Sequence, residues 1–215
     1  MATIKQSIQD WQHIFLDSSI IINLLLYKKN PDEASAAFVY KLISYLSANK
    51  TKDNKNRIFY ISAITISEIL IKENDREKIE KILTAIDSQD VEFISFDEAI
   101  ALQMTSQMHS YLANTELHRF AEEIGWKSHE LMLAREWITR DYMIVMSGIN
   151  RKVDVLLTMD KNTFYPICEK ADGFCVLCYD NLFNFNDTYF FEYNAGKAKE
   201  FATKKKKGHK VDITT

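Results

Sequence analysis

A short apolar run that ends in an aspartate sets the strongest constraint on the fold of this chain. Ile14-Phe15-Leu16 is apolar at every position, leads directly into Asp17, and is followed by Ser18 and Ser19. A strand without polar alternation is typical of a parallel sheet that helices cover on both faces. Ser18 and Ser19 are suitable caps for a helix that starts there. We therefore expect Asp17 at the carboxyl end of a strand, where open α/β sheets bind their ligands.

The rest of the chain alternates between short apolar runs and longer segments with helical periodicity. Further strands are expected at 58–61, 91–94, 153–157 and 174–179. Helices are expected at 20–27, 31–46, 63–71, 75–86, 99–112 and 128–149, with Asp97 as a cap and residues 47–57 as a loop. Only 5 glycines and 2 prolines occur, which disfavours a turn-rich β-sandwich. The order predicts an α/β/α sandwich with a central, mainly parallel sheet of about five strands.

Composition sets broad limits on location and partners. The 215 residues are 47% hydrophobic, which is enough for a substantial core, and the net charge of −3 does not itself indicate a nucleic-acid-binding protein. Three cysteines, no signal peptide and no apolar run long enough for a bilayer predict a reducing, cytoplasmic location without membrane contact.

The charge of the chain is uneven, because four consecutive lysines lie near its C-terminus: Lys204, Lys205, Lys206 and Lys207. A block of like charges is most often a solvated tail. The functional alternative is an arm that holds the phosphates of a nucleic acid.

The helix expected from residue 128 carries an acid where an apolar residue belongs. Its apolar stripe consists of Leu131, Ala134, Ile138, Val145 and Ile149. The missing member of this i, i+3/i+4 series is position 141, which is aspartate. A carboxylate on a core-facing stripe is costly unless it is paired or binds a metal.

Two further acids occur in similarly unusual places. Ile61, Ile64 and Ile71 mark the apolar side of the helix after the second strand, and Glu68 interrupts it. Val155–Leu157 leads through Thr158 and Met159 to Asp160, which repeats the pattern around Asp17. If the first and fourth strands are neighbours, Asp17 and Asp160 meet at one edge of the sheet, and Glu68 and Asp141 can join them.

Four carboxylates in one place repel one another and stay ionised only with cations between them. Hard oxygen ligands without His or Cys select Mg²⁺ or Mn²⁺ rather than zinc. Such a site can bind a phosphodiester oxygen, lower the pKa of a water and stabilise a leaving oxyanion. Each acid alone also has an ordinary explanation, because Asp17 and Asp160 can cap helices and Glu68 can pair with a lysine. The set is therefore more informative than its members.

These residues resemble the PIN-domain family, in particular the VapC-like ribonuclease toxins of bacterial toxin–antitoxin pairs. The matching segments follow the family's order: Ile14–Ser19, Tyr60–Leu70, Phe93–Ala101, Asp141–Ile144 and Leu156–Phe164, the last with its Thr-x-Asp and trailing Phe. The resemblance covers about residues 13 to 180. It implies a PIN-like fold and Mg²⁺-dependent endoribonuclease activity on RNA, with Mn²⁺ as a substitute.

The resemblance also implies roles for single residues and for partners. Asp17, Glu68, Asp141 and Asp160 are expected to hold the metal and carry catalysis, with Ser18 and Thr158 orienting them. A cognate antitoxin and a homodimer are the partners expected beside RNA. The lysines that would help to bind this RNA are Lys204, Lys205, Lys206 and Lys207. The expected organisation is a nuclease domain over 1–185 with a helical insertion at about 114–127, and a C-terminal extension over 186–215.

Other interpretations stay open. The same fold class includes receiver-like phosphoacceptor domains, but these need paired acids after the first strand and a lysine at a late strand end. Haloacid-dehalogenase phosphatases need Asp-x-Asp, which Asp17-Ser18-Ser19 does not provide. A PIN-like module that only binds RNA or protein is a third alternative.

Two remaining patterns are weighed against structural roles. Cys175 and Cys178 form a C-x-x-C pair inside an apolar run, which favours buried strand residues over a redox or zinc site. Basic residues that flank the early helices are mostly ordinary solvated charges, but some are candidates for the walls of an RNA path: Lys28, Lys29, Lys50, Lys52, Lys55 and Arg57.

Overall fold

The computed structural model of this chain describes residues 7–72, 77, 91–111, 119, 121–123 and 131–178. Its centre is a five-stranded, all-parallel sheet with the strand order β3-β2-β1-β4-β5. The strands are β1 (His13–Leu16), β2 (Ile58–Ser62), β3 (Val91–Ile94), β4 (Val155–Thr158) and β5 (Cys175–Leu177). The helices are α1 (Ser18–Lys29), α2 (Ala34–Ala48), α3 (Ala63–Lys72), α5 (Glu98–Tyr111), α7 (Leu131–Asn150) and α8 (Phe164–Lys170). The predicted α/β class and parallel five-stranded sheet are confirmed.

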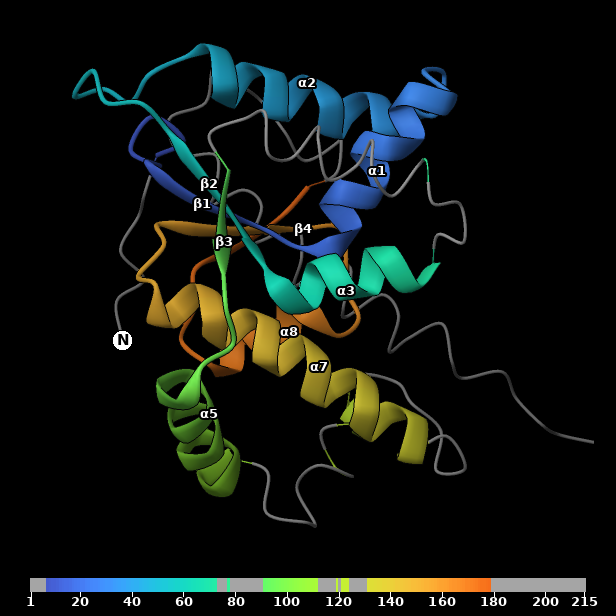
Figure 1. The fold of residues 1–215 in the computed structure, drawn as a ribbon, viewed down its shortest axis with the longest axis vertical. Coiled ribbons are helices and arrows are strands. Elements are labelled where there is room, and N and C mark those ends of the chain that lie inside the picture. The colour runs from blue at the N-terminus through green and yellow to red at the C-terminus, as the bar shows by residue number, and fades with distance from the viewer. Residues whose placement is uncertain are drawn as a thin grey trace, which may run out of the picture.

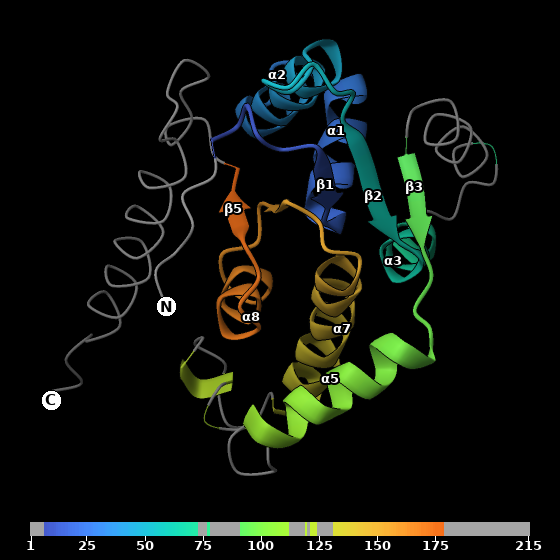
Figure 2. The ribbon, with the colours of Figure 1, turned by 90° about the vertical axis from the view of Figure 1, so that its left-hand side faces the viewer.

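Helices cover both faces of this sheet. In Figures 1 and 2, α1 and α2 lie on one face, and α7, α8 and α5 lie on the other. The strands β1 and β4 are neighbours in the middle of the sheet, with Leu16 opposite Leu157. This pairing confirms the expectation that the first and fourth strands run side by side, so the residues that follow them share one edge.

Each face of the central strands packs into its own hydrophobic core. Ile14 and Leu16 belong to the core beneath α1 and α2, whereas Phe15 between them belongs to the core beneath α7 and α8. The strand is therefore buried on both faces, as its unbroken apolar sequence predicts. A Cβ atom on Gly148 would come within 3.0 Å of Leu156 Cδ2 and 3.2 Å of Phe15 Cδ2, so glycine allows α7 to approach the sheet closely.

Several boundaries differ from the sequence-based expectation. The helix α8 was not expected, because it has only seven residues and contains Pro166. Proline is compatible with the first turn of a helix, where its missing N–H has no intrahelical partner. A parallel β4–β5 pair also requires a crossover connection, and α8 provides it. Nearly all of the expected helix at 75–86, nearly all of the insertion at 114–127 and the whole extension from 186 lie outside the described residues.

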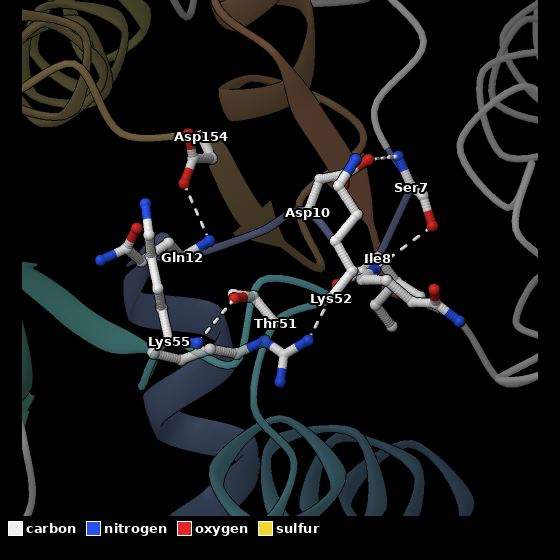
Figure 3. A network of polar contacts seen from close by, with 10 residues as sticks. Ser7, Ile8, Asp10, Gln12, Thr51, Lys52, Lys55 and Asp154 are labelled. Carbon is white, nitrogen blue, oxygen red and sulfur yellow. Dashed lines mark hydrogen bonds and ion pairs between the residues drawn. The ribbon is translucent and has the colours of Figure 1, made fainter.

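The loop before β2 is tied to the N-terminal segment by polar contacts, shown in Figure 3. Asp10 receives a hydrogen bond from the backbone N–H of Ser7 and forms an ion pair with Lys52 at 2.5 Å. Asp154 accepts the backbone N–H of Gln12 and thereby fixes the start of β1 against β4. These contacts fix the positions of the segment before β1 and of the loop before β2.

Arg57 is buried inside the same loop region. It donates to the carbonyl oxygens of Ile8, Trp11, Leu46 and Asn49. Arg57 is therefore neither a solvated charge nor a candidate for the wall of an RNA path, because its buried guanidinium holds the loop together.

No helix in the described part of the chain is both long enough and apolar enough to cross a bilayer.

Candidate functional site

Asp17 lies between the end of β1 and the start of α1. Its backbone N–H donates to the carbonyl oxygen of Leu157 at 3.1 Å, so Asp17 is fixed to the neighbouring strand β4. Its carboxylate caps α1 by accepting the N–H groups of Ser18 at 2.6 Å and Ser19 at 3.4 Å. Asp17, and not either serine, is therefore the N-cap, which corrects the sequence-based expectation. A strand end followed directly by a helix start explains why an aspartate suits this position.

Hydroxyl groups from two elements surround the same carboxylate. Oδ2 of Asp17 accepts hydrogen bonds from Oγ of Ser19 at 2.6 Å and from Oγ1 of Thr158 at 2.8 Å. Thr158 is the last residue of β4, so its hydroxyl connects the neighbouring strand ends. The hydroxyl of Ser18 lies farther from Oδ1, at 3.3 Å.

Asp160 follows β4 by two residues and turns the chain into α8. Its Oδ1 accepts the N–H groups of Asn162 at 2.7 Å and Thr163 at 3.1 Å. Its Oδ2 accepts the hydroxyl of Thr163 and the N–H of Phe164. Asp160 therefore has a structural role in the turn as well as a place near Asp17.

Asp141 is buried on the inward stripe of α7. The neighbours Ile138 and Val145 on that stripe are fully buried, as the apolar periodicity predicts. Thr163, whose hydroxyl donates to Asp160, lies beside Asp141 as well. Thr163 thus connects an acid on a helix with an acid at a strand end.

Glu68 points inward from α3 and is only 6% exposed. Its Oε1 lies 3.5 Å from Nη1 of Arg140, which precedes Asp141 on α7. The expectation that Ile71 shares the buried side of α3 is wrong, because Ile71 is 74% exposed. The buried face is instead formed by Thr65, Glu68 and Ile69, which are three and four residues apart.

The charges of these acids act on one another. Burial raises the pKa of Asp141 well above its ordinary value, and the charges of Asp17, Asp160 and Glu68 raise it further. Burial also raises the pKa of Asp17, although hydrogen bonds from Ser19, Thr158 and Ser18 oppose this and the charge of Asp160 adds to it. The structure therefore brings the four acids from α3, α7 and two strand ends into one electrostatically interacting group.

The chemistry of this group suits a hard divalent cation. Its donors are carboxylate oxygens, which Mg²⁺ and Mn²⁺ prefer. The Oγ1 atom of Thr65 is buried on α3, one turn before Glu68, and has no hydrogen-bond partner. A buried hydroxyl without a partner is costly, so a water or ligand near Glu68 would satisfy it.

The present side-chain positions are not those of a metal-bound site. Within the described residues, no group of three or more His, Cys, Asp or Glu side chains is arranged so that it could hold a metal ion. Asp17 and Asp160 instead direct their oxygens to neighbouring N–H and hydroxyl donors. Binding a cation thus requires these carboxylates to exchange some of those hydrogen bonds for metal contacts.

Three polar residues of the site were not predicted to belong to it, although Ser19 was expected as a helix cap. Ser19 binds Asp17 more closely than the expected Ser18 does, and it also accepts the N–H of Met159 at 2.8 Å. Thr163 donates to Asp160 beside Asp141, and Arg140 pairs with Glu68. The adjacent Ser18-Ser19 pair and the Asp-x-x-Thr spacing of Asp160 and Thr163 were the available signals.

The cysteines have the structural role that their apolar surroundings favour. Cys178 is buried directly after β5, Cys175 is half-buried within that strand, and both thiols are free.

The C-terminal lysine run that was expected to bind RNA cannot be placed beside the acids. Its four members lie outside the described residues: Lys204, Lys205, Lys206 and Lys207. Their role in RNA binding therefore stays a prediction.

Comparison with known proteins gives distant structural likenesses and no sequence match. No protein-family model matches the sequence, and no curated protein sequence matches it. Among solved structures, a chain from the crystal structure of VapBC2 from Rickettsia felis, bound to a DNA fragment from their promoter, aligns with a TM-score of 0.45 and 16% identity. The alignment covers 76% of this chain and 96% of that chain.

Proposed function

We propose that this protein is a Mg²⁺-dependent endoribonuclease that hydrolyses phosphodiester bonds in RNA, with Mn²⁺ as a substitute. The observation that carries the proposal is that the charges of Asp17, Glu68 and Asp160, which come from separate elements, all act on the buried carboxylate of Asp141. The resemblance of the surrounding sequence motifs to PIN-domain ribonucleases supports RNA as the substrate.

A purely structural explanation accounts for part of this group. Asp17 and Asp160 each accept backbone N–H groups as caps and turn residues do. It does not account for Asp141, which is buried against three other acids at a cost in free energy. A cation bound by all four acids would explain why a carboxylate is buried at position 141.

The residues of the chain have distinct roles in this proposal. When bound, the cation polarises a phosphate oxygen and lowers the pKa of a water. The four carboxylates would hold the cation, and the hydroxyls of Ser19 and Thr158 fix the orientation of Asp17. One carboxylate of the group would accept the proton of the attacking water.

The test is cleavage of RNA by the purified full-length chain in MgCl₂ or MnCl₂ and in EDTA. We expect fragments only with metal, and we expect Asp141→Asn to abolish them. Asp32→Asn is the matched control, because Asp32 is exposed and outside the acid group. Cleavage that persists in EDTA, or that Asp141→Asn leaves intact, would contradict the proposal.

The biological role that the motif resemblance suggests is that of a toxin with a cognate antitoxin, acting in the cytoplasm. Induced expression in a bacterial host should then arrest growth, and Asp141→Asn should relieve the arrest. Equal growth with both proteins would contradict the toxin role without affecting the proposed chemistry.

A further inference from the structure

An exposed arginine and an exposed tryptophan lie on α7 directly beside the buried acids. The Arg140 side chain is 41% exposed, and it reaches inward to Glu68 at 3.5 Å. Its guanidinium also lies over the ring of Trp137, with Cζ at 5.6 Å from the ring centroid. Trp137 is itself 41% exposed.

The spacing of these residues forms a row that leads to the acids. Trp137 precedes Arg140 by three residues and Asp141 by four, so all three lie on neighbouring rows of α7. Residues four apart on a helix are neighbours on its surface, so Trp137 lies about one turn of α7 from Asp141. We expect an extended substrate that reaches Asp141 along α7 to pass over the indole and the guanidinium.

Electrostatic repulsion explains why a positively charged side chain is needed at this position. A group of four acids repels an anionic phosphodiester, so an approaching phosphate needs a positive group at the edge. Arg140 supplies this charge in direct contact with Glu68. A guanidinium has five N–H donors in a planar fork, so it can contact Glu68 and a phosphate oxygen together.

The indole supplies the second half of a nucleotide-binding surface. Aromatic side chains that lie open to solvent next to a cationic groove stack on the bases of single-stranded nucleic acids. Such stacking needs an unpaired base with an exposed π-face, which a duplex does not offer. A protein partner is the other use of an exposed tryptophan, but it does not explain why the arginine beside it contacts an acid of the site.

We propose that Trp137 and Arg140 bind one nucleotide of a single-stranded RNA next to the acid group, with the base stacked on Trp137 and the phosphate on Arg140. This inference rests on the proposed nuclease function and names the form of its substrate. It adds binding residues that the sequence motifs did not indicate.

The experiment measures binding of fluorescein-labelled oligo(U) and oligo(A) by anisotropy in MgCl₂. An Asp160→Asn background disables the proposed cleavage so that affinity is measured on intact RNA. We expect Trp137→Ala to weaken binding about 5- to 100-fold, the range of losing one stacked base. Trp137→Phe should retain most of the affinity.

Arg140 is tested through the salt dependence of the same affinity. Arg140→Gln should lower the slope of log affinity against log salt by about one, because one phosphate contact is lost. Arg140→Lys keeps the charge and should keep the slope. If Arg140→Gln only breaks the ion pair with Glu68, it should lower the melting temperature without changing this slope. That result would overturn the proposed contact between Arg140 and a phosphate.

Two matched controls lie elsewhere on the surface. Arg151 also pairs with a glutamate and lies over an aromatic ring, but its partners are Glu92 and Tyr60 at the far end of α7. Phe93 is an aromatic residue on β3 that is 48% exposed. Arg151→Gln and Phe93→Ala should leave RNA affinity within about twofold of the parent protein.

The outcomes separate this inference from the proposed function. Wild-type cleavage of RNA, together with Trp137 and Arg140 variants that bind like the controls, would overturn the nucleotide site and leave the nuclease intact. Equal losses of affinity for single-stranded and duplex RNA would also overturn it. Loss of single-strand binding in these variants, with no cleavage by the wild type, would support the nucleotide site and contradict the nuclease.

Discussion

The hydroxyl of Thr158 donates to Oδ2 of Asp17 across 2.8 Å and so connects the ends of the two central strands. The hydroxyl of Ser19 also links the two strand ends, because it donates to the same oxygen of Asp17 and accepts the N–H of Met159. The site is thus supported by the strand pair at the centre of the sheet, and a change to these hydroxyls should affect both folding and chemistry.

Ser19→Ala should destabilise the protein by about 1–3 kcal/mol, because the N–H of Met159 loses its partner in a half-buried place. For a chain of this length, the melting temperature should fall by roughly 2–4 °C per kcal/mol. Thermal denaturation followed by circular dichroism measures the change. Ser18→Ala is the control and should cost less, since its hydroxyl is 3.3 Å from Asp17. A larger loss with Ser18→Ala would contradict this assignment.

Asp141→Asn should stabilise the metal-free protein at neutral pH. The variant removes a buried charge that three other acids repel, while its amide retains a group that can hydrogen-bond to Thr163. The melting temperature in EDTA measures this effect, and Asp32→Asn should leave it unchanged. A clearly lower melting temperature for Asp141→Asn would show that the carboxylate of Asp141 stabilises the folded protein, which would contradict this prediction.

The pH dependence of stability follows from the same raised pKa values. Unfolded aspartates have a pKa of about 4, and the folded values of Asp141 and Asp17 lie above this. Between the unfolded and folded values, the folded state binds more protons, so these groups make stability fall as pH rises. Urea denaturation in EDTA from pH 4 upward should show this decline, and Asp141→Asn should reduce it. A decline of equal size in the variant would assign it to other groups.

Thr65→Val should raise the stability of the metal-free protein and weaken metal binding. Valine has nearly the same shape but lacks the buried hydroxyl that has no partner, whose burial costs roughly 1–3 kcal/mol. If the hydroxyl binds a water of the metal site beside Glu68, the affinity for Mn²⁺ should fall in the same variant. Thr65→Ser retains the hydroxyl and is the control. Unchanged Mn²⁺ affinity with a loss of stability would contradict the assigned role.

Deletion of residues 204–215 should weaken RNA affinity and reduce its salt dependence, because it removes the four consecutive lysines Lys204, Lys205, Lys206 and Lys207. Anisotropy titrations at several salt concentrations measure both quantities. An unchanged salt slope would show that the lysine run is a solvated tail.

Most of the fold could be predicted from the sequence because its strands are short, apolar and regularly spaced. The burial of β1 on both faces and the neighbouring positions of β1 and β4 follow from apolar runs that end in acids. The helix α8 was missed because seven residues with a proline give no clear periodicity. Ile71 was misplaced because the buried face of α3 turns toward Thr65 and Glu68, which apolar spacing alone cannot indicate.

The site was predictable in its acids but less so in their surroundings. An acid on an apolar stripe, as at Asp141, is a strong local signal. The partners of such acids come from distant segments: Thr158 binds Asp17 over 141 positions, and Arg140 reaches Glu68 from another helix. These residues become neighbours only when the sheet and helices pack together. Hydroxyl and guanidinium partners of this kind carry no periodic signal of their own.

The most direct test of the account is a Mn²⁺ titration of the full-length chain followed by electron paramagnetic resonance, which reports free Mn²⁺. We predict that the wild type removes Mn²⁺ from solution, that Mg²⁺ competes with it, and that Asp141→Asn binds much more weakly while Asp32→Asn binds normally. Equal binding by wild type and Asp141→Asn, or no binding by either, would contradict the claim that the four acids form a metal site.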